Sequence, residues 1–305
     1  MFAEAALQPG KIDPFKEVID NAGFELSESL HIHPLLPKLH LFGVEYQITK
    51  FQVLLAIAAI IVAGAMVWLG RKVKNGDTPK GLCWNAIESL LFFVRDNIAR
   101  AGMGHDGDKF VPFLTTMFLF IFITNLLGMI PFLGSATASI AVTFALALIS
   151  FVVIHIAGFK ENGVAGYFKT FIPHIHLEGG PAIQIMGFFI KWGMAVLEYA
   201  TAFIRLAVLS IRLFANMLAG HTALFMILFF IQMVAKPHPG DPSGVFTHFL
   251  PHMELPSWLY YPISLFSVVM VFALSLLEIF VAALQAFIFS LLTSIFIGLA
   301  KHPAH

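Results

Sequence analysis

Four charged side chains recur every seven residues inside a long apolar segment: Lys191, Glu198, Arg205 and Arg212. Seven residues turn an α-helix through about 700°, roughly 20° short of two full turns, so the four side chains share one stripe. Asn216 extends this stripe by one turn. An arginine near a bilayer centre costs about 3 kcal/mol on insertion scales. The stripe therefore indicates a function that needs charge within an apolar helix.

A histidine and a glutamate form a second candidate group. His221 follows Arg212 by nine residues, so it is rotated by about 180° and displaced by about 13.5 Å along the same helix. Glu278 is the only carboxylate within the last apolar segment, and Gln285 lies seven residues further on. Imidazole and carboxylate groups exchange protons with water at moderate pH. We expect His221 and Glu278 to pair, on a different side from Arg212.

The composition indicates an integral membrane protein. Of the 305 residues 58% are hydrophobic and only 12% are charged, whereas a soluble domain carries about 25% charged residues. The formal net charge of zero argues against a nucleic-acid partner. The single cysteine excludes an internal disulfide, and we expect no metal site, because His31, His33 and His40 lie among prolines without further ligands at suitable spacing.

The segment 1–49 is polar, and we expect it to lie outside the membrane. The uncharged segment 51–69 is long enough to cross a hydrocarbon core of about 30 Å. Basic residues follow it, at Arg71, Lys72, Lys74 and Lys80. By the positive-inside rule these residues are cytoplasmic and the N-terminus is outside.

Three further elements precede the charged stripe. Segment 80–101 mixes apolar and charged residues, which favours an amphipathic helix at the membrane surface. Segments 110–133 and 136–158 are two spans joined by a tight outer turn at Gly134 and Ser135, and Lys160 places the following loop inside.

The last two apolar segments, 182–235 and 257–300, are unusually long. Ile263 to Ile297 contains neither glycine nor proline, and 35 residues make a helix of about 52 Å, which fits the bilayer only at a tilt of roughly 55°. A hidden turn in each segment is the other interpretation, but polar turn residues are absent between Ile263 and Ile297. We therefore predict an all-α membrane domain, 50–305, whose last two helices form a steeply tilted hairpin.

A family resemblance rests on the segment from Arg212 to His221 together with Leu284–Gln285–Ala286–Phe287. These residues, with Asn125 to Pro131 and the element order from about residue 45, resemble the a subunit of rotary F-type ATP synthases, also called subunit 6. The resemblance implies a proton-conducting stator subunit in the lipid bilayer, which is not an enzyme by itself and needs no cofactor. Its implied partners are the c-subunit ring and the b subunits of the peripheral stalk.

The resemblance also implies roles for individual residues. Arg212 matches the stator arginine that faces the ring carboxylates and separates two offset half-channels. Matches to the outer half-channel and to the surroundings of the arginine are His221, Glu278, Asn216 and Gln285. Glu198 matches a residue of the inner half-channel. Many bacterial members have glutamate and histidine in the reverse order at the positions of His221 and Glu278, so the pair is retained with its members exchanged.

Two other functions compete with this interpretation. A secondary transporter with an anionic substrate at Arg212 would predict inverted repeats and broken helices, which the sequence lacks. An intramembrane metalloenzyme is disfavoured because Pro251 interrupts the spacing between His248 and His252. We expect a multi-pass protein of the bacterial plasma (inner) membrane, with the mitochondrial inner membrane as the alternative.

Overall fold

The computed structural model describes residues 38–41, 44–47, 49–74, 81–129, 135–170, 181–234 and 257–301. Two short strands come first, β1 (Lys38–Leu41) and β2 (Val44–Gln47), which pair antiparallel with Leu41 opposite Val44. This hairpin lies in the segment 1–49, which was predicted to lie outside the membrane and for which no strands were predicted. Apolar and polar residues alternate through both strands, which is the period of a β-strand.

Helices form the rest of the described chain. Those before the charged stripe are α1 (Lys50–Lys74), α2 (Leu82–Val94), α3 (Arg100–Met103), α4 (Val111–Gly128) and α5 (Ile140–Thr170). A π-helical turn, Arg95–Ala99, joins α2 to α3, and 3-10 turns at Gly104–Phe110 and Ala136–Ala138 precede α4 and α5. Five stretches of the described chain are long and apolar enough to cross a membrane, so this is a multi-pass membrane protein. The surface position of α2 stays a prediction.

The α5 helix extends further than predicted. It was expected to end near residue 158, where charged residues begin, but it continues to Thr170 with a kink at Gly163 (φ 69°, ψ 160°). A positive φ of this size favours glycine, and the non-helical backbone at Gly163 divides α5 into two helical stretches. His31, His33, Gly134, His248 and His252 lie outside the described residues.

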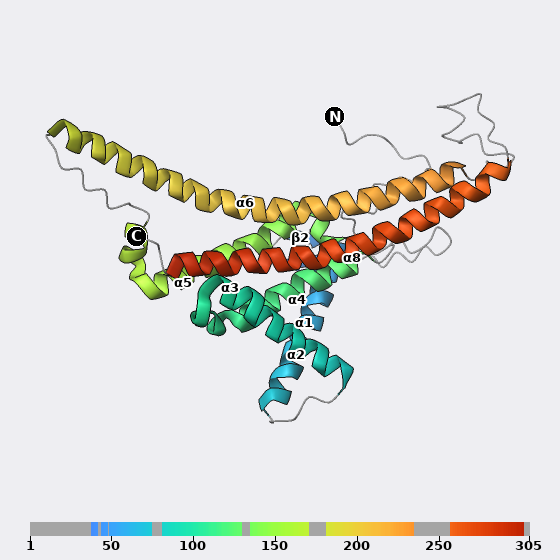
Figure 1. Cartoon of the computed structure of the whole chain (residues 1–305), viewed down its shortest axis with the longest axis horizontal. Coiled ribbons are helices and arrows are strands. Elements are labelled where there is room, and N and C mark those ends of the chain that lie inside the picture. The colour runs from blue at the N-terminus through green and yellow to red at the C-terminus, as the bar shows by residue number, and fades with distance from the viewer. Residues whose placement is uncertain are drawn as a thin grey trace.

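The last two helices, α6 (Pro181–Val234) and α8 (Ser257–Lys301), are each continuous. This excludes the hidden turn that the sequence left open. At about 1.5 Å per residue they are roughly 81 and 68 Å long, more than twice the thickness of a hydrocarbon core of about 30 Å. Figure 1 shows them side by side, running across the direction of α1. Their tilt relative to a membrane stays a prediction.

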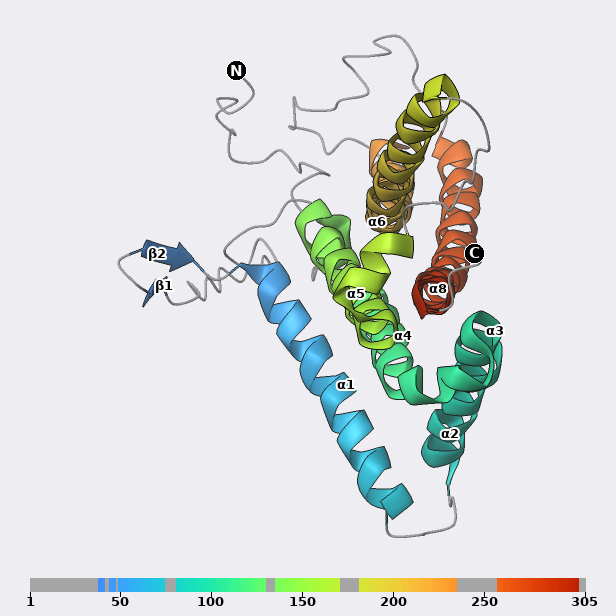
Figure 2. The ribbon, with the colours of Figure 1, turned by 90° about the vertical axis from the view of Figure 1, so that its left-hand side faces the viewer.

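The shorter helices support one side of the α6 and α8 pair. In Figure 2, α4 and α5 lie beneath the pair, with α1 on one side and α2 and α3 on the other. Leu114 and Ile121 of α4, Leu213 of α6 and Phe289 of α8 are fully buried in one shared core. Since lipid tails are as apolar as leucine, close packing and hydrogen bonds hold such helices together.

Small residues allow α3 and α8 to touch. A Cβ added at Gly102 would overlap Ser294 and the backbone of Ile295. The Ser294 hydroxyl donates a hydrogen bond of 2.8 Å to the carbonyl of Ile98 in the π-helical turn. This contact fixes the C-terminal half of α8 against the preceding helices.

Ion pairs hold the C-terminal end of α8. Lys301 is only 6% exposed, and its Nζ lies 3.1 Å from Asp106 Oδ2 and 3.6 Å from Glu161 Oε2. The amide of Asn162 donates a hydrogen bond of 3.1 Å to the carbonyl of Ala300. A cation is also favourable at a helix C-terminus. These contacts join α8 to α5 and to the turn before α4.

Candidate functional site

Arg212 lies beside the core-facing row of α6 and does not belong to it. That row consists of Leu209, Leu213, Met217 and His221, spaced by four residues and all buried. Arg212 is partly exposed, and it makes no ion pair or hydrogen bond with any residue that the structure describes. A guanidinium keeps its proton in proteins. The site therefore presents a fixed positive charge at the edge of the α6 and α8 pair.

One turn further along α6, a carboxamide pair connects the two long helices. Asn216 Nδ2 donates a hydrogen bond of 2.7 Å to Gln285 Oε1 on α8. Gln285 is only 2% exposed, whereas Asn216 is exposed. The bond sets the register between α6 and α8 next to Arg212.

His221 and Glu278 face each other across the same pair of helices, as the sequence analysis expected. The His221 Nε2 to Glu278 Oε1 distance is 3.8 Å, and both side chains are buried. This distance exceeds that of a hydrogen bond. Gly220 makes room for the carboxylate, because a Cβ there would lie 2.8 Å from Glu278 Oε1. Two titratable groups thus lie close together on the core-facing side of α6, away from Arg212.

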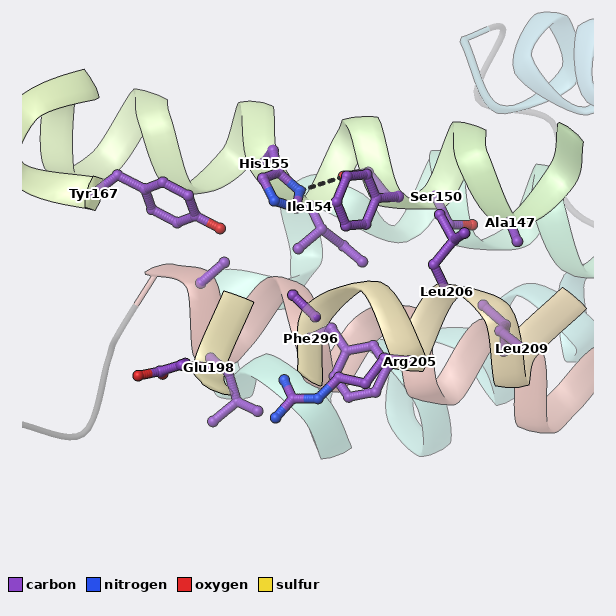
Figure 3. Close-up of a pocket in the computed structure, with 14 residues that line it drawn as sticks. Ala147, Ser150, Ile154, His155, Tyr167, Glu198, Arg205, Leu206, Leu209 and Phe296 are labelled. Atoms are coloured by element: carbon purple, nitrogen blue, oxygen red, sulfur yellow. Dashed lines mark hydrogen bonds between the residues drawn. The ribbon is translucent and has the colours of Figure 1, made fainter. Parts of the chain in front are cut away.

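The other end of the charged stripe opens on a cavity between α5, α6 and α8. Its volume is about 110 Å³, and its polar lining comes from Ser150, His155, Tyr167, Glu198 and Arg205 (Figure 3). The Arg205 guanidinium lies over the ring of Phe296 on α8, 5.0 Å from the ring centroid, a favourable cation–π geometry. Two members of the predicted stripe therefore line one cavity.

The kink in α5 brings Tyr167 to this cavity. Beyond Gly163 the chain folds back, and the Tyr167 ring packs on Gly158 so closely that a Cβ there would overlap it. The rings of Tyr167 and His155 meet edge to face, with centroids 5.8 Å apart. Burial raises the pKa of the Tyr167 phenol, and the neighbouring Tyr199 adds to the effect. The phenol therefore keeps its proton at neutral pH.

Sequence reasoning missed several of these side chains. His155 and Tyr167 belong to α5, whose period gives no sign of the cavity, although a histidine within an apolar span is itself a signal of function. A second missed contact is the bond of 3.2 Å between the Thr143 and Ser210 hydroxyls, which joins α5 to α6 two residues before Arg212. Of the predicted residues, Lys191 is half-buried and does not line the cavity.

Comparison with known proteins places the chain in a family. A family model described as "ATP synthase A chain" matches residues 52–298. The chain is 35% identical to ATP synthase subunit a of Myxococcus xanthus over 263 residues, which cover 86% of this chain and 75% of that protein. It is 34% identical to ATP synthase subunit a 2 of Chlorobaculum tepidum (99% and 78% covered) and 33% identical to ATP synthase subunit a of Chloroherpeton thalassium (97% and 79% covered). The chain therefore belongs to the ATP synthase A chain family.

Proposed function

We propose that this chain is the proton-conducting stator subunit of an ATP synthase Fo sector, with Arg212 as the residue that couples proton flow to rotation. Membership of the family supports a non-catalytic subunit of that sector. The observation that carries the role of Arg212 is its partly exposed guanidinium, which has no partner within the described chain. A charge retained in an apolar helix without an internal partner is suited to a partner on another chain.

Two polar sites lie on either side of this arginine. Along α6, His221 is nine residues beyond Arg212 and Glu198 is fourteen residues before it, or about 13.5 and 21 Å at 1.5 Å per residue. In the proposal His221, Glu278, Asn216 and Gln285 form the outer proton path, and Glu198 belongs to the inner one. Because the two paths are offset along the helix, a proton crosses the membrane only by travelling on a ring carboxylate.

The arginine has two tasks in this scheme. Its fixed charge attracts a ring carboxylate and stabilises the ionised form, so the carboxylate releases its proton on arrival. The same charge repels a proton that would pass directly between the two paths. Coupling therefore depends on a cation that does not itself titrate.

The surface around Arg212 is suited to an apolar partner. Its large exposed side chains are Ile204, Val208 and Ile211 of α6 and Leu277, Phe280 and Leu284 of α8. We propose that the c-subunit ring covers this surface, and that the b subunits and lipid contact other faces. A location in the bacterial plasma membrane is proposed because the relatives compared above are bacterial proteins.

A secondary transporter is not favoured. Transporters of that kind build their sites from broken helices near mid-membrane, whereas α6 and α8 are each continuous. The family match also supports the ATP synthase function.

The decisive experiment replaces the arginine in the whole complex. Arg212→Ala in inverted membrane vesicles is expected to reduce proton-driven ATP synthesis to background, and to leave passive proton flux through Fo unchanged or higher because the barrier charge is gone. Lys191→Ala is the control, since Lys191 shares the stripe but neither polar site, and it should retain synthesis. Coupled synthesis by the Arg212→Ala complex would refute the proposed role.

A further inference from the structure

The cavity between α5, α6 and α8 contains a histidine whose ring orientation is fixed. His155 Nδ1 lies 2.8 Å from the carbonyl oxygen of Phe151, one turn earlier in α5. A carbonyl only accepts hydrogen bonds, so Nδ1 carries the hydrogen and Nε2 of the neutral ring is a proton acceptor. The Phe151 ring packs against the imidazole, with centroids 3.9 Å apart. Nε2 makes no hydrogen bond with any described residue.

The groups around this imidazole are few. On its own helix the Tyr167 ring lies against it, and α6 contributes Glu198 and Arg205 to the cavity lining. The α8 helix contributes only Phe296, Leu299 and Ala300, none of which titrates. Figure 3 shows His155 on the side of α5 that faces α6.

Other charged groups nearby are already paired or point elsewhere. Lys301 of α8 pairs with Asp106 and Glu161. Lys160 and Glu161 are exposed residues of α5 and do not line the cavity. The titratable groups that share the cavity with His155 are therefore Tyr167, Glu198 and Arg205. Of these, the phenol and the guanidinium keep their protons at neutral pH, and Glu198 is the carboxylate.

We propose that His155 is a proton-relay residue of the inner access path, where it exchanges protons between the inner aqueous phase and the cavity beside Glu198. A space of about 110 Å³ is large enough for several water molecules, since each takes about 30 Å³ in the liquid. When the complex pumps protons outward, Nε2 binds a proton from a hydronium ion on the inner side, which becomes water, and then passes that proton to water in the cavity. During synthesis the same steps run in reverse, and His155 ends each cycle neutral. This role rests on the proposed proton-conducting function.

The test uses the whole complex in inverted vesicles, whose inner face is turned to the medium, and measures ATP-driven proton uptake against the pH of the medium. His155→Ala and His155→Gln are expected to lower the rate by about threefold or more, a modest loss for an acid–base group. Because a relay works by binding and releasing a proton, the loss should depend on the pH of the medium, whereas loss of a packing role would lower the rate equally at every pH. His105→Gln is the matched control, because His105 is an exposed histidine of the turn before α4 that does not line the cavity.

Chemical rescue separates a relay from a packing role. Added imidazole at millimolar concentration should restore uptake by His155→Ala, which leaves space for it, but not by His155→Gln, whose side chain fills the space. Wild-type rates in both variants across the pH range would overturn the inference, and so would a loss that is equal at every pH and not rescued. If Arg212→Ala abolishes synthesis while the His155 variants behave as wild type, the relay is wrong and the proposed function stands. If Arg212→Ala retains coupled synthesis, the proposed function itself fails.

Discussion

At the scale of single residues, the proposed outer path depends on an imidazole and a carboxylate that lie close together without a direct hydrogen bond. The 3.8 Å between His221 Nε2 and Glu278 Oε1 is short enough for strong electrostatic coupling. Neither Glu278 oxygen has a hydrogen-bond partner among the described residues. A buried carboxylate in that position is expensive unless it is neutral or faces a cation, so the proton shared by this pair is expected to be mobile.

Glu278→Gln tests that expectation. Glutamine keeps the volume and polarity of the side chain but binds no proton, so we expect proton translocation to fall by about tenfold or more, as for loss of an acid–base group, while the protein remains in the membrane. Ser275→Ala is the control, because its hydroxyl bonds to the Val271 carbonyl of the same helix. Proton flux measured in vesicles that is equal in Glu278→Gln and wild type would remove Glu278 from the path. The double variant His221→Glu with Glu278→His keeps one imidazole and one carboxylate in exchanged positions. We expect its proton flux to be higher than that of Glu278→Gln.

At the scale of elements, close approach of α8 to its neighbours determines where its functional side chains lie. Gly102 and Ser294 bring α3 against α8, and the Ser294 hydroxyl bonds to the carbonyl of Ile98. Asn216 and Gln285 then set the register with α6. Packing of this kind is intolerant of added atoms, because interiors have no spare volume.

Gly102→Ala should therefore destabilise the bundle. The new Cβ would overlap the Ser294 hydroxyl and lie 2.8 Å from the Ile295 backbone nitrogen, and overpacking of this kind costs about 1 to 3 kcal/mol. Gly64→Ala is the matched control, because a Cβ there meets nothing within 4 Å and alanine favours the helix. Thermal dissociation of the purified complex should occur at a lower temperature for Gly102→Ala only. Equal dissociation temperatures for the two variants would show that the close contact between α3 and α8 does not contribute to the stability of the complex.

Sequence reasoning succeeded best where long apolar runs lack helix breakers. The helices α6 and α8 begin and end within one residue of the predicted segments 182–235 and 257–300. The prediction was firmest for α8, because Ile263 to Ile297 contains neither glycine nor proline. The part of α5 beyond residue 158 was not predicted. The charged residues there indicate where the membrane ends, but a helix can continue past the membrane surface. The prediction that His221 faces Glu278 followed from the need of a lone carboxylate in an apolar helix for a partner. The cavity was not predicted, because it requires the kink at Gly163 and three helices in their folded positions.

At the scale of the whole molecule, the lengths of α6 and α8 predict their orientation. A helix of about 81 Å cannot stand upright in a hydrocarbon core of about 30 Å without placing much of its apolar surface in water. Exposed apolar residues occur along most of α6, from Ile190 through Val208 to Met226. We therefore expect α6 to lie steeply tilted within the membrane.

Spin labels can measure this tilt. Single cysteines replace Ile190, Val208 and Met226, one at a time, in a chain whose Cys83 is changed to serine, and the membrane depth of each label is measured by power saturation in nanodiscs. Thirty-six residues separate the outer two sites, or about 54 Å along the axis. A tilted helix keeps both outer labels near the headgroups. Labels far out in water on both sides would contradict the orientation.

The attachment of α8 at one end has a mechanical consequence. Its C-terminal half is buried against α3, α4 and α5 and is clamped at Lys301, whereas most of the side chains from Leu265 to Phe280 are exposed. Within this chain, α8 is therefore held by several helices at its C-terminal half, whereas its N-terminal half packs mainly against α6 (Figure 1). If the proposed c-subunit ring moves past this helix, the sideways load would bend α8 most near the point where the buried half begins, and Glu278 lies near that point.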